Sequence, residues 1–264
     1  IGFLLGLFDD AYDTKPLIKL FAQILCGVIL IFTNVYIRIF DSEILNYLIT
    51  IIWVVGMMNS INMLDNMDAI TTLVSISILS TIIISLFISG NFNNPDLFIM
   101  LGLLASLVGF LKFNWSPATI YMGDTGSQFL GAFLSAIGII YFWNNNDNVS
   151  EMLAISKQII VTVLVFSIPI IDTTTVVIKR LRKGKSPFIG GKDHTAHHIS
   201  YLGFNDKQVA LIFICISVIT MILTIIAINF IQIWSYLYVC LYVAYLFLLF
   251  ISLFYIANLN IQKN

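Results

Sequence analysis

Charged residues are scarce in this sequence: Asp, Glu, Lys and Arg together make up 10% of its 264 residues. Soluble globular proteins carry about 25% charged residues. Hydrophobic residues reach 59%, and the mean hydropathy is +0.97. This composition excludes a soluble globular enzyme. It indicates an integral membrane protein whose partners include the lipid bilayer and no nucleic acid.

Cysteine is also rare, and its spacing is not that of a metal site. Cys26, Cys215 and Cys240 each lie inside an apolar run. We expect them to be buried small hydrophobic residues rather than redox-active or metal-binding groups. The sequence also lacks a recognisable signal peptide, an internal repeat and a long linker, so we expect a single domain, residues 1–264.

The apolar runs do not alternate polar and apolar residues, as the strands of a membrane β-barrel do. They are about 20 residues long, the length at which a helix crosses a bilayer. We therefore predict an all-α, polytopic transmembrane bundle with about eight full spans after an N-terminal helix stub, which suggests a shortened form of a longer protein. The expected spans are 17–39, 44–58, 69–89, 97–112, 127–143, 157–179, 208–230 and 233–257.

The polar clusters fall in every second gap between these spans. They are Asp9–Asp10, 59–68, 114–127 and 179–198. Alternate crossings would bring all four clusters to one face. Of the 13 Lys and Arg residues, only Arg38 and Lys157 lie toward the other face. By the positive-inside rule the clustered face is cytoplasmic, so we expect a multi-pass protein of the inner (plasma) membrane whose active site faces the cytoplasm.

Two carboxylates stand side by side at Asp9 and Asp10, where the first helix should reach water. Like charges this close raise one another's pKa unless a cation or proton donor is near. A helix C-terminus is also the unfavourable end for anions. We interpret the pair as a base or as groups that position a metal or phosphate, the alternative being an ordinary acidic helix end. Lys19 is either a phosphate-binding cation or a lysine that reaches for the membrane surface.

Asn59, Asn62, Asp65 and Asp68 recur at every third position. Side chains three apart share a helical face, so the first three should project together while Asp68 turns away. Hard oxygen donors of this kind suit Mg²⁺ or Mn²⁺ and a ribose or base. A solvated cap between two spans is the alternative, and it explains four such residues poorly.

The segment 113–127 contains Gly123 and Gly126, which permit close backbone approach and positive φ. Thr125 or Ser127 could cap the helix that follows. The free N–H groups at the start of that helix could bind a phosphate, beside Asp124 as a metal ligand. A tight capped turn would explain the glycines but not an aspartate next to an aromatic residue.

The last cluster is basic and histidine-rich. Its histidines are His194, His197 and His198. The run 179–185 has five cations in seven residues, and we expect its first part mainly to anchor the membrane edge. The histidines could bind zinc or contact a phosphate, although zinc would lack cysteine partners. Asp172 lies inside a span and is therefore a functional candidate, and Pro169 could kink that helix.

Four segments of the chain are recognisable together. They are Phe8-Asp9-Asp10 with Lys19 and Gln23, the Asn59-x-x-Asn62-x-x-Asp65-x-x-Asp68 repeat, Tyr121-Met122-Gly123-Asp124-Thr125-Gly126-Ser127, and the histidine-rich loop. In this order, and across essentially the whole chain, they resemble the polyprenyl-phosphate N-acetylhexosamine-1-phosphate transferases. The short spacing from Asp10 to Lys19 is more similar to the GlcNAc-1-phosphate transferase branch than to the phospho-N-acetylmuramoyl-pentapeptide transferases.

The resemblance implies a bacterial enzyme that transfers a HexNAc-1-phosphate, in the first place GlcNAc-1-phosphate, from a UDP-HexNAc to undecaprenyl phosphate or a similar polyprenyl phosphate. UMP is released, a cell-envelope glycan is started, and Mg²⁺ is required, with Mn²⁺ as an alternative. It also implies about two further N-terminal helices, and a homodimer is left open.

The resemblance also assigns roles by position. The catalytic residues would be Asp9, Asp10, Lys19 and Asp124, and the metal ligands Asp124 and Asn62. Lys19 would contact the diphosphate, and the Asp9–Asp10 pair would activate or position the lipid phosphate. The substrate-binding residues would be Asn59, Asp65, Asp68, Tyr121, Gly123, His194, His197 and His198, with Tyr121 stacked on uracil.

The chain departs from the family pattern at two places. Asn66 and Ala69 replace glycines that often follow the two acidic residues, and alanine tolerates left-handed geometry poorly. Thr195 replaces the first histidine of a His-x-His-His pattern, which leaves the roles of the individual histidines open.

Several other functions remain as alternatives. A phospho-N-acetylmuramoyl-pentapeptide transferase activity is the nearest. A cation-coupled transporter should carry carboxylates near the bilayer midplane, whereas here Asp172 alone lies inside a span. A CDP-alcohol phosphotransferase should carry an Asp-Gly-x-x-Ala-Arg signature, which this sequence lacks. A scaffold without activity is the last alternative.

Overall fold

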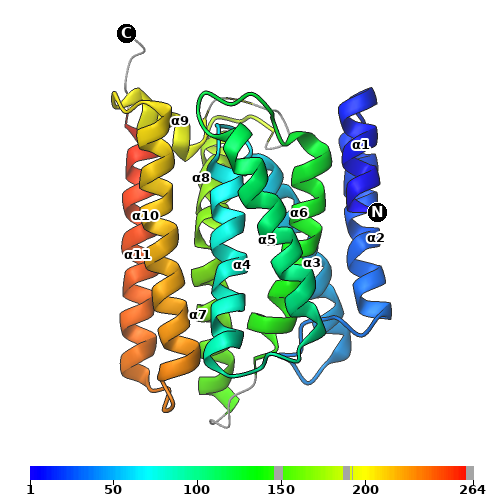
Figure 1. Cartoon of the computed structure of the whole chain (residues 1–264), viewed down its shortest axis with the longest axis vertical. Coiled ribbons are helices and arrows are strands. Elements are labelled where there is room, and N and C mark those ends of the chain that lie inside the picture. The colour runs from blue at the N-terminus through cyan, green and yellow to red at the C-terminus, as the bar shows by residue number, and fades with distance from the viewer. Residues whose placement is uncertain (146–150, 187–190, 192, 260–264) are drawn as a thin grey trace. The chain divides into compact units, whose positions relative to one another are not determined.

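The structure, a computed structural model, describes residues 1–145, 151–186, 191 and 193–259, and within them it contains helices and connections but no strand (Figure 1). The α-helices are α1 (Gly2–Tyr12), α2 (Pro16–Phe32), α3 (Glu43–Leu64), α4 (Ile70–Ile88), α5 (Pro95–Asn114), α6 (Gly123–Gly138), α7 (Glu151–Val165), α8 (Ser167–Arg182), α9 (Thr195–Tyr201), α10 (Asp206–Ile225) and α11 (Tyr236–Asn258). Two π-helical turns, η1 (Ile139–Trp143) and η2 (Ile226–Phe230), extend α6 and α10.

Six helices in the described part of the chain are long and apolar enough to cross a membrane. They are α3, α4, α5, α6 with η1, α10 with η2, and α11. The bent pair α7 and α8 makes a seventh if it counts as one span, and α2 is a shorter apolar helix of 17 residues. The predicted polytopic helical membrane protein is confirmed, but the described residues contain six or seven such helices and not the eight full spans expected. Lys192 and Lys263, counted among the cytoplasmic cations, lie outside the described residues.

Three predicted spans have clearly different limits in the structure, and the one expected at 44–58 runs on to Leu64 as α3. The span expected at 17–39 ends at Phe32, because Asn34 takes a left-handed conformation with φ 68°. The backbone beyond it bonds side chains instead, as Ile37 N–H does with the Thr50 hydroxyl. The span expected at 157–179 breaks between α7 and α8. Pro169 explains this break, because it lacks the N–H that would bond the carbonyl of Val165 and it fits the first turn of a new helix.

The chain forms two compact units, each assembled from separate stretches of sequence. Unit 1 comprises Ile1–Asn62, Met122–Val163 and Gln232–Val239, and unit 2 comprises Met63–Tyr121, Leu164–Ile231 and Cys240–Asn264. Because α3 and α11 run from one unit into the other, neither unit is an independent segment of chain. The prediction of a single domain therefore stays a prediction.

In unit 1, α6 packs closely against α1 and α3 at glycines. A Cβ on Gly6 of α1 would lie 2.2 Å from the carbonyl oxygen of Asp124, and a Cβ on Gly131 of α6 would lie 2.6 Å from the Cα of Met58. Small residues let helix backbones approach in this way within membranes. The polar residues at the start of α6 are thereby held against α1.

In unit 2, the side chain of Asn114 organises the connection into α4. Its Oδ1 accepts the N–H of Ala69 at 3.2 Å and the hydroxyl of Thr72 at 2.7 Å, and its Nδ2 donates to the carbonyl of Ile120 at 3.1 Å. Ala69 has φ 67°, the left-handed conformation that usually takes glycine. The buried bonds of Asn114 hold the alanine in that conformation.

The three cysteines are free. Cys26 is buried, as expected. The expectation of burial is wrong for Cys215 and Cys240, which are exposed on α10 and α11. Both helices are apolar enough to face lipid, where a small hydrophobic side chain needs no burial in protein.

Candidate active site

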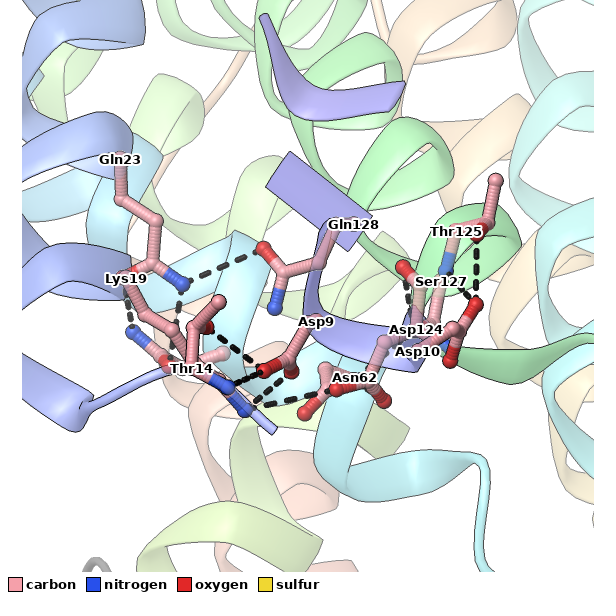
Figure 2. Close-up of polar contacts among 11 residues, drawn as sticks. Asp9, Asp10, Thr14, Lys19, Gln23, Asn62, Asp124, Thr125, Ser127 and Gln128 are labelled. Carbon is pink, nitrogen blue, oxygen red and sulfur yellow. Dashed lines mark hydrogen bonds and ion pairs between the residues drawn. The ribbon is translucent and has the colours of Figure 1, made fainter. Parts of the chain in front are cut away.

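Asp9 and Asp10 lie in the last turn of α1, and their side chains contact different residues (Figure 2). Asp9 is buried, whereas Asp10 is exposed. Asp9 Oδ1 accepts the Thr14 N–H at 2.9 Å and the Thr14 hydroxyl at 2.7 Å. Asp9 Oδ2 forms an ion pair with the ammonium of Lys19. Burial would raise the pKa of Asp9, but its bonds with Asp124, Lys19 and Thr14 hold it well below its ordinary value.

Lys19 lies in the first turns of α2, between two carboxylates. Its Nζ pairs with Asp9 and stands 3.4 Å from Asp124 Oδ2. The Lys19 side chain is 29% exposed, so it is only partly buried. Lys19 is thus one cation set between two carboxyl groups.

Asp124 begins α6 and is oriented by the end of α3. Asn62 donates from Nδ2 to Asp124 Oδ1 at 2.8 Å and to the Ser127 hydroxyl oxygen at 2.8 Å. The structure therefore brings Asp9, Lys19, Asn62 and Asp124 together from four helices of unit 1. These residues come from three of the four polar segments that the sequence analysis identified.

Asp10 bonds the first turn of α6. Its Oδ1 accepts the Asp124 N–H at 2.9 Å, and its Oδ2 accepts the N–H and the hydroxyl of Thr125 at 2.9 and 2.5 Å. Burial alone would raise the pKa of Asp10, but these bonds lower it below its ordinary value. The expectation that Thr125 or Ser127 caps α6 is wrong: no side chain at the Met122 cap position bonds the helix, and the carboxylate of Asp10 does so instead.

This contact also corrects the expectation that the N–H groups of α6 are free for a phosphate. Those of Asp124 and Thr125 are already bonded, because a carboxylate satisfies a helix N-terminus as a phosphate does. Gly123 has φ 65°, and a Cβ on it would lie 3.0 Å from Asp10 Oδ2. The predicted close approach at Gly123 is thus present, made by Asp10, and a substrate contact of Gly123 stays a prediction.

Behind the charged cluster lies an amide network. Gln23 donates from Nε2 to Asn59 Oδ1 and to Gln128 Oε1, both at 3.2 Å, and Asn59 Nδ2 donates to Gln23 Oε1 and the Val55 carbonyl, both at 2.8 Å. Gln23 and Gln128 are almost fully buried. Asn59 is thus engaged by protein, and its contact with substrate stays a prediction. Sequence reasoning missed Gln128, although its position four residues after Asp124 puts it on the same helical face.

The oxygen donors of this cluster fit a magnesium ion. Mg²⁺ is commonly held by one or two carboxylates, waters and the phosphates of a substrate, rather than by an all-protein cage. Asp9 and Asp124 flank the Lys19 ammonium and supply two carboxylates. Among the described residues no group of three or more His, Cys, Asp or Glu could hold a metal ion. Asn62 turns its NH₂ group, not its carbonyl oxygen, toward Asp124, so its role as a metal ligand stays a prediction.

The remaining candidates belong to unit 2. The helical face predicted for Asn59, Asn62 and Asp65 ends early, because α3 stops at Leu64 and Asp65 lies in the turn that follows. Asp68 Oδ2 accepts the Ala118 N–H at 2.9 Å and so stabilises the same loop as Asn114. Tyr121 is exposed. The predicted substrate contacts of Asp65, Asp68 and Tyr121 stay predictions.

His194 is paired with Asp172, the aspartate that the sequence analysis noted inside a span. His194 Nδ1 lies 2.8 Å from Asp172 Oδ2, and Asp172 Oδ1 accepts the Thr195 N–H at 2.8 Å. Both side chains are buried. Asp172 therefore fixes the imidazole of His194 and the start of α9, a helix that the sequence did not predict. The ring of His197 lies 5.9 Å from that of His194.

Two buried basic residues of α8, Lys179 and Arg180, each bind a residue of the histidine-rich loop. Lys179 Nζ lies 2.6 Å from His198 Nε2 and donates to the carbonyl of Ala257. Burial and the charge of Lys179 lower the pKa of His198 to about 4. Arg180 binds Asp193 through two nitrogens, at 2.9 and 2.7 Å. Lys179 and Arg180 thus bind protein groups, and the anchoring of the membrane edge by this run stays a prediction. Residues 187–190 and 192 of this loop lie outside the described residues.

The fold and the cluster together define a polytopic helical membrane protein with carboxylates, an ammonium and amides gathered at the ends of its helices. Residues 1–142 match the model of the family described as Glycosyl transferase family 4. The chain belongs to that family.

Curated relatives agree with this assignment. A probable undecaprenyl-phosphate N-acetylglucosaminyl 1-phosphate transferase of Bacillus subtilis is 28% identical over 79% of this chain and 58% of its own length. A decaprenyl-phosphate N-acetylglucosaminephosphotransferase of Mycobacterium leprae is 26% identical over 79% and 57%. A phospho-N-acetylmuramoyl-pentapeptide-transferase of Campylobacter jejuni is 29% identical over 67% and 56%. The chain thus spans little more than half the length of these relatives.

Proposed function

We propose that this protein transfers a HexNAc-1-phosphate, with GlcNAc-1-phosphate as the first candidate, from a UDP-sugar to undecaprenyl phosphate. UMP is released, and the lipid-linked sugar starts a cell-envelope glycan. The family and the names of its relatives support the reaction class. The observation that carries the proposal is the Lys19 ammonium set between Asp9 and Asp124 at the start of α6.

The reaction joins two anions. An oxygen of the lipid phosphate attacks the β-phosphorus of the UDP-sugar, a new P–O bond forms, and the bond to the bridging oxygen breaks so that UMP leaves with the electron pair. Catalysis of such a transfer needs positive charge and fixed geometry more than covalent participation. Lys19 would supply a cation that is positioned by two carboxylates.

Asp9 orients Lys19 in this scheme. Its lowered pKa makes it a weak base. The lipid phosphate needs little help to ionise, because the second pKa of a phosphate monoester is about 6. Asp124 and Asn62 would hold Mg²⁺, with Mn²⁺ as an alternative; the Asn62 amide already lies 2.8 Å from Asp124 Oδ1. When bound, the metal ion would neutralise charge on the diphosphate as a Lewis acid.

We further propose that the site faces the cytoplasm of a bacterial inner membrane, where UDP-sugars are made. The positive-inside distribution of Lys and Arg supports this orientation. A phospho-N-acetylmuramoyl-pentapeptide transferase activity is the second candidate, favoured by the Campylobacter jejuni relative.

Membranes from cells that overproduce the protein provide the test. Incubated with Mg²⁺, undecaprenyl phosphate and radiolabelled UDP-GlcNAc, they should form labelled lipid and UMP, and EDTA should stop both. Asp124→Asn should lower turnover at least about 100-fold while the protein remains folded. Absence of labelled lipid and of UMP with every UDP-HexNAc, the UDP-linked muramoyl pentapeptide included, would reject the transferase function.

A further inference from the structure

The carboxylate of Asp10 is bonded through both of its oxygens to the first turn of α6. Both of its oxygens accept bonds there, from the N–H groups of Asp124 and Thr125 and from the Thr125 hydroxyl. The first N–H groups of an α-helix have no partner within the helix. No side chain at the Met122 cap position supplies one, so the cap comes from a residue 114 positions earlier in the chain.

Two glycines make this contact sterically feasible. A Cβ on Gly123 would lie 3.0 Å from Asp10 Oδ2, and a Cβ on Gly6 would lie 2.2 Å from the Asp124 carbonyl oxygen. The glycine at position 6 lets α1 reach the backbone of α6, and the glycine at position 123 leaves room for the carboxylate. The contact therefore depends on a glycine in each of the two helices, α1 and α6.

We propose that Asp10 is a positioning residue for Asp124 and not the group that accepts a proton from the lipid phosphate. This inference rests on the proposed transferase function. Asp10 accepts the backbone N–H of Asp124 and so fixes the position of that residue. The side-chain carboxylate of the same Asp124 contacts Lys19 and Asn62. The adjacent carboxylates then have separate tasks: Asp9 orients Lys19, and Asp10 fixes the start of α6.

Thr125 offers a test that leaves both carboxylates in place. Thr125→Val removes the hydroxyl that donates to Asp10 but keeps the side-chain volume, whereas Thr125→Ser keeps the hydroxyl and is the matched control. Thr125→Val should lower kcat about tenfold, because a charge-assisted bond is lost, with the KM for UDP-GlcNAc changed less than about twofold. Thr125→Ser should stay near wild type.

Asp10→Asn and the double variant complete a thermodynamic cycle. An amide at position 10 keeps one acceptor oxygen, so Asp10→Asn should retain measurable turnover. The double variant should lose less activity than the product of the two single losses, because both changes remove the same contact. The unfolding midpoints of the four solubilised proteins should show the same lack of additivity.

The proposal is overturned if Thr125→Val turns over like wild type, if Asp10→Asn abolishes turnover, or if the losses of the two single variants multiply independently in the double variant. A wild-type protein that forms no lipid-linked sugar contradicts the proposed function instead. In that case the unfolding midpoints test the contact between Asp10 and Thr125. Strictly additive shifts of the midpoint would show that the two residues are not coupled.

Discussion

Replacing Gly6 by alanine tests whether the close packing of α1 on α6 sets the geometry of the charged cluster. The new methyl group would lie 2.2 Å from the Asp124 carbonyl oxygen and 2.4 Å from the Thr125 Cα. Both are backbone atoms of a helix, so they cannot move aside as the end of a flexible side chain can. The helix α1 itself must shift.

The size of the shift follows from the distances. Ordinary van der Waals contact of a Cβ begins at 3.4 Å, so the separation must grow by about 1.2 Å. A bond of 2.9 Å from Asp10 to the Asp124 N–H would stretch to about 4 Å, which is no longer a hydrogen bond. Misplacement of catalytic groups by about 1 Å can cost about 100-fold in rate, and overpacking costs about 1–3 kcal/mol of stability.

We therefore expect Gly6→Ala to lower kcat for lipid-linked sugar formation about 100-fold, measured with radiolabelled UDP-GlcNAc in membranes. Gly56→Ala is the matched control, because Gly56 lies on α3 of the same unit and a Cβ there would meet nothing within 4 Å. The control should keep wild-type activity. If Gly6→Ala retains more than half of the wild-type rate at equal protein amounts, α1 does not set the site geometry.

Two further predictions concern charge. Lys19→Met should lower kcat/KM by about 100- to 1,000-fold, because Asp9 and Asp124 lose the cation between them. The control Lys19→Arg should keep part of the rate. A Lys19→Met rate within tenfold of wild type would exclude Lys19 from the site. For His198, the pKa is about 4 in the folded protein and about 6.5 when unfolded. The unfolded chain thus takes up the extra proton as the pH falls from 6.5 to 4, and stability should fall across that window. The unfolding midpoint should follow this slope, and His198→Asn should flatten it; equal slopes would contradict the shifted pKa.

The helices of this protein could be predicted from sequence because each long apolar run must satisfy its backbone bonds internally. The limits of the helices were harder to predict where local backbone geometry decides them. Asn34 ends α2 by taking a left-handed conformation, which the apolar pattern does not reveal. The helix α9 was missed because its seven residues are too few to show an apolar period.

The charged cluster was predicted as a set of residues, but its bonds were not. Residue types at a regular spacing identified Asp9, Lys19, Asn62 and Asp124 as candidates. Their partners depend on how α1, α2, α3 and α6 pack, and no local pattern contains that information. Gln128 bonds Gln23 of α2. It lies inside an apolar run, so the sequence indicated only a residue of a membrane span.

The Asp9–Asp10 pair shows why adjacency in sequence is a poor guide to shared chemistry. Successive residues of an α-helix project about 100° apart, so two neighbouring carboxylates turn toward different helices. Here one meets the ammonium of Lys19 on α2 and the other meets the N-terminus of α6. Each negative charge is offset by its own positive partner, an ammonium in one case and helix N–H groups in the other. The repulsion expected of the pair is thereby outweighed: bonds with Asp124, Lys19 and Thr14 lower the pKa of Asp9, and the bonds with Thr125 and Asp124 lower that of Asp10.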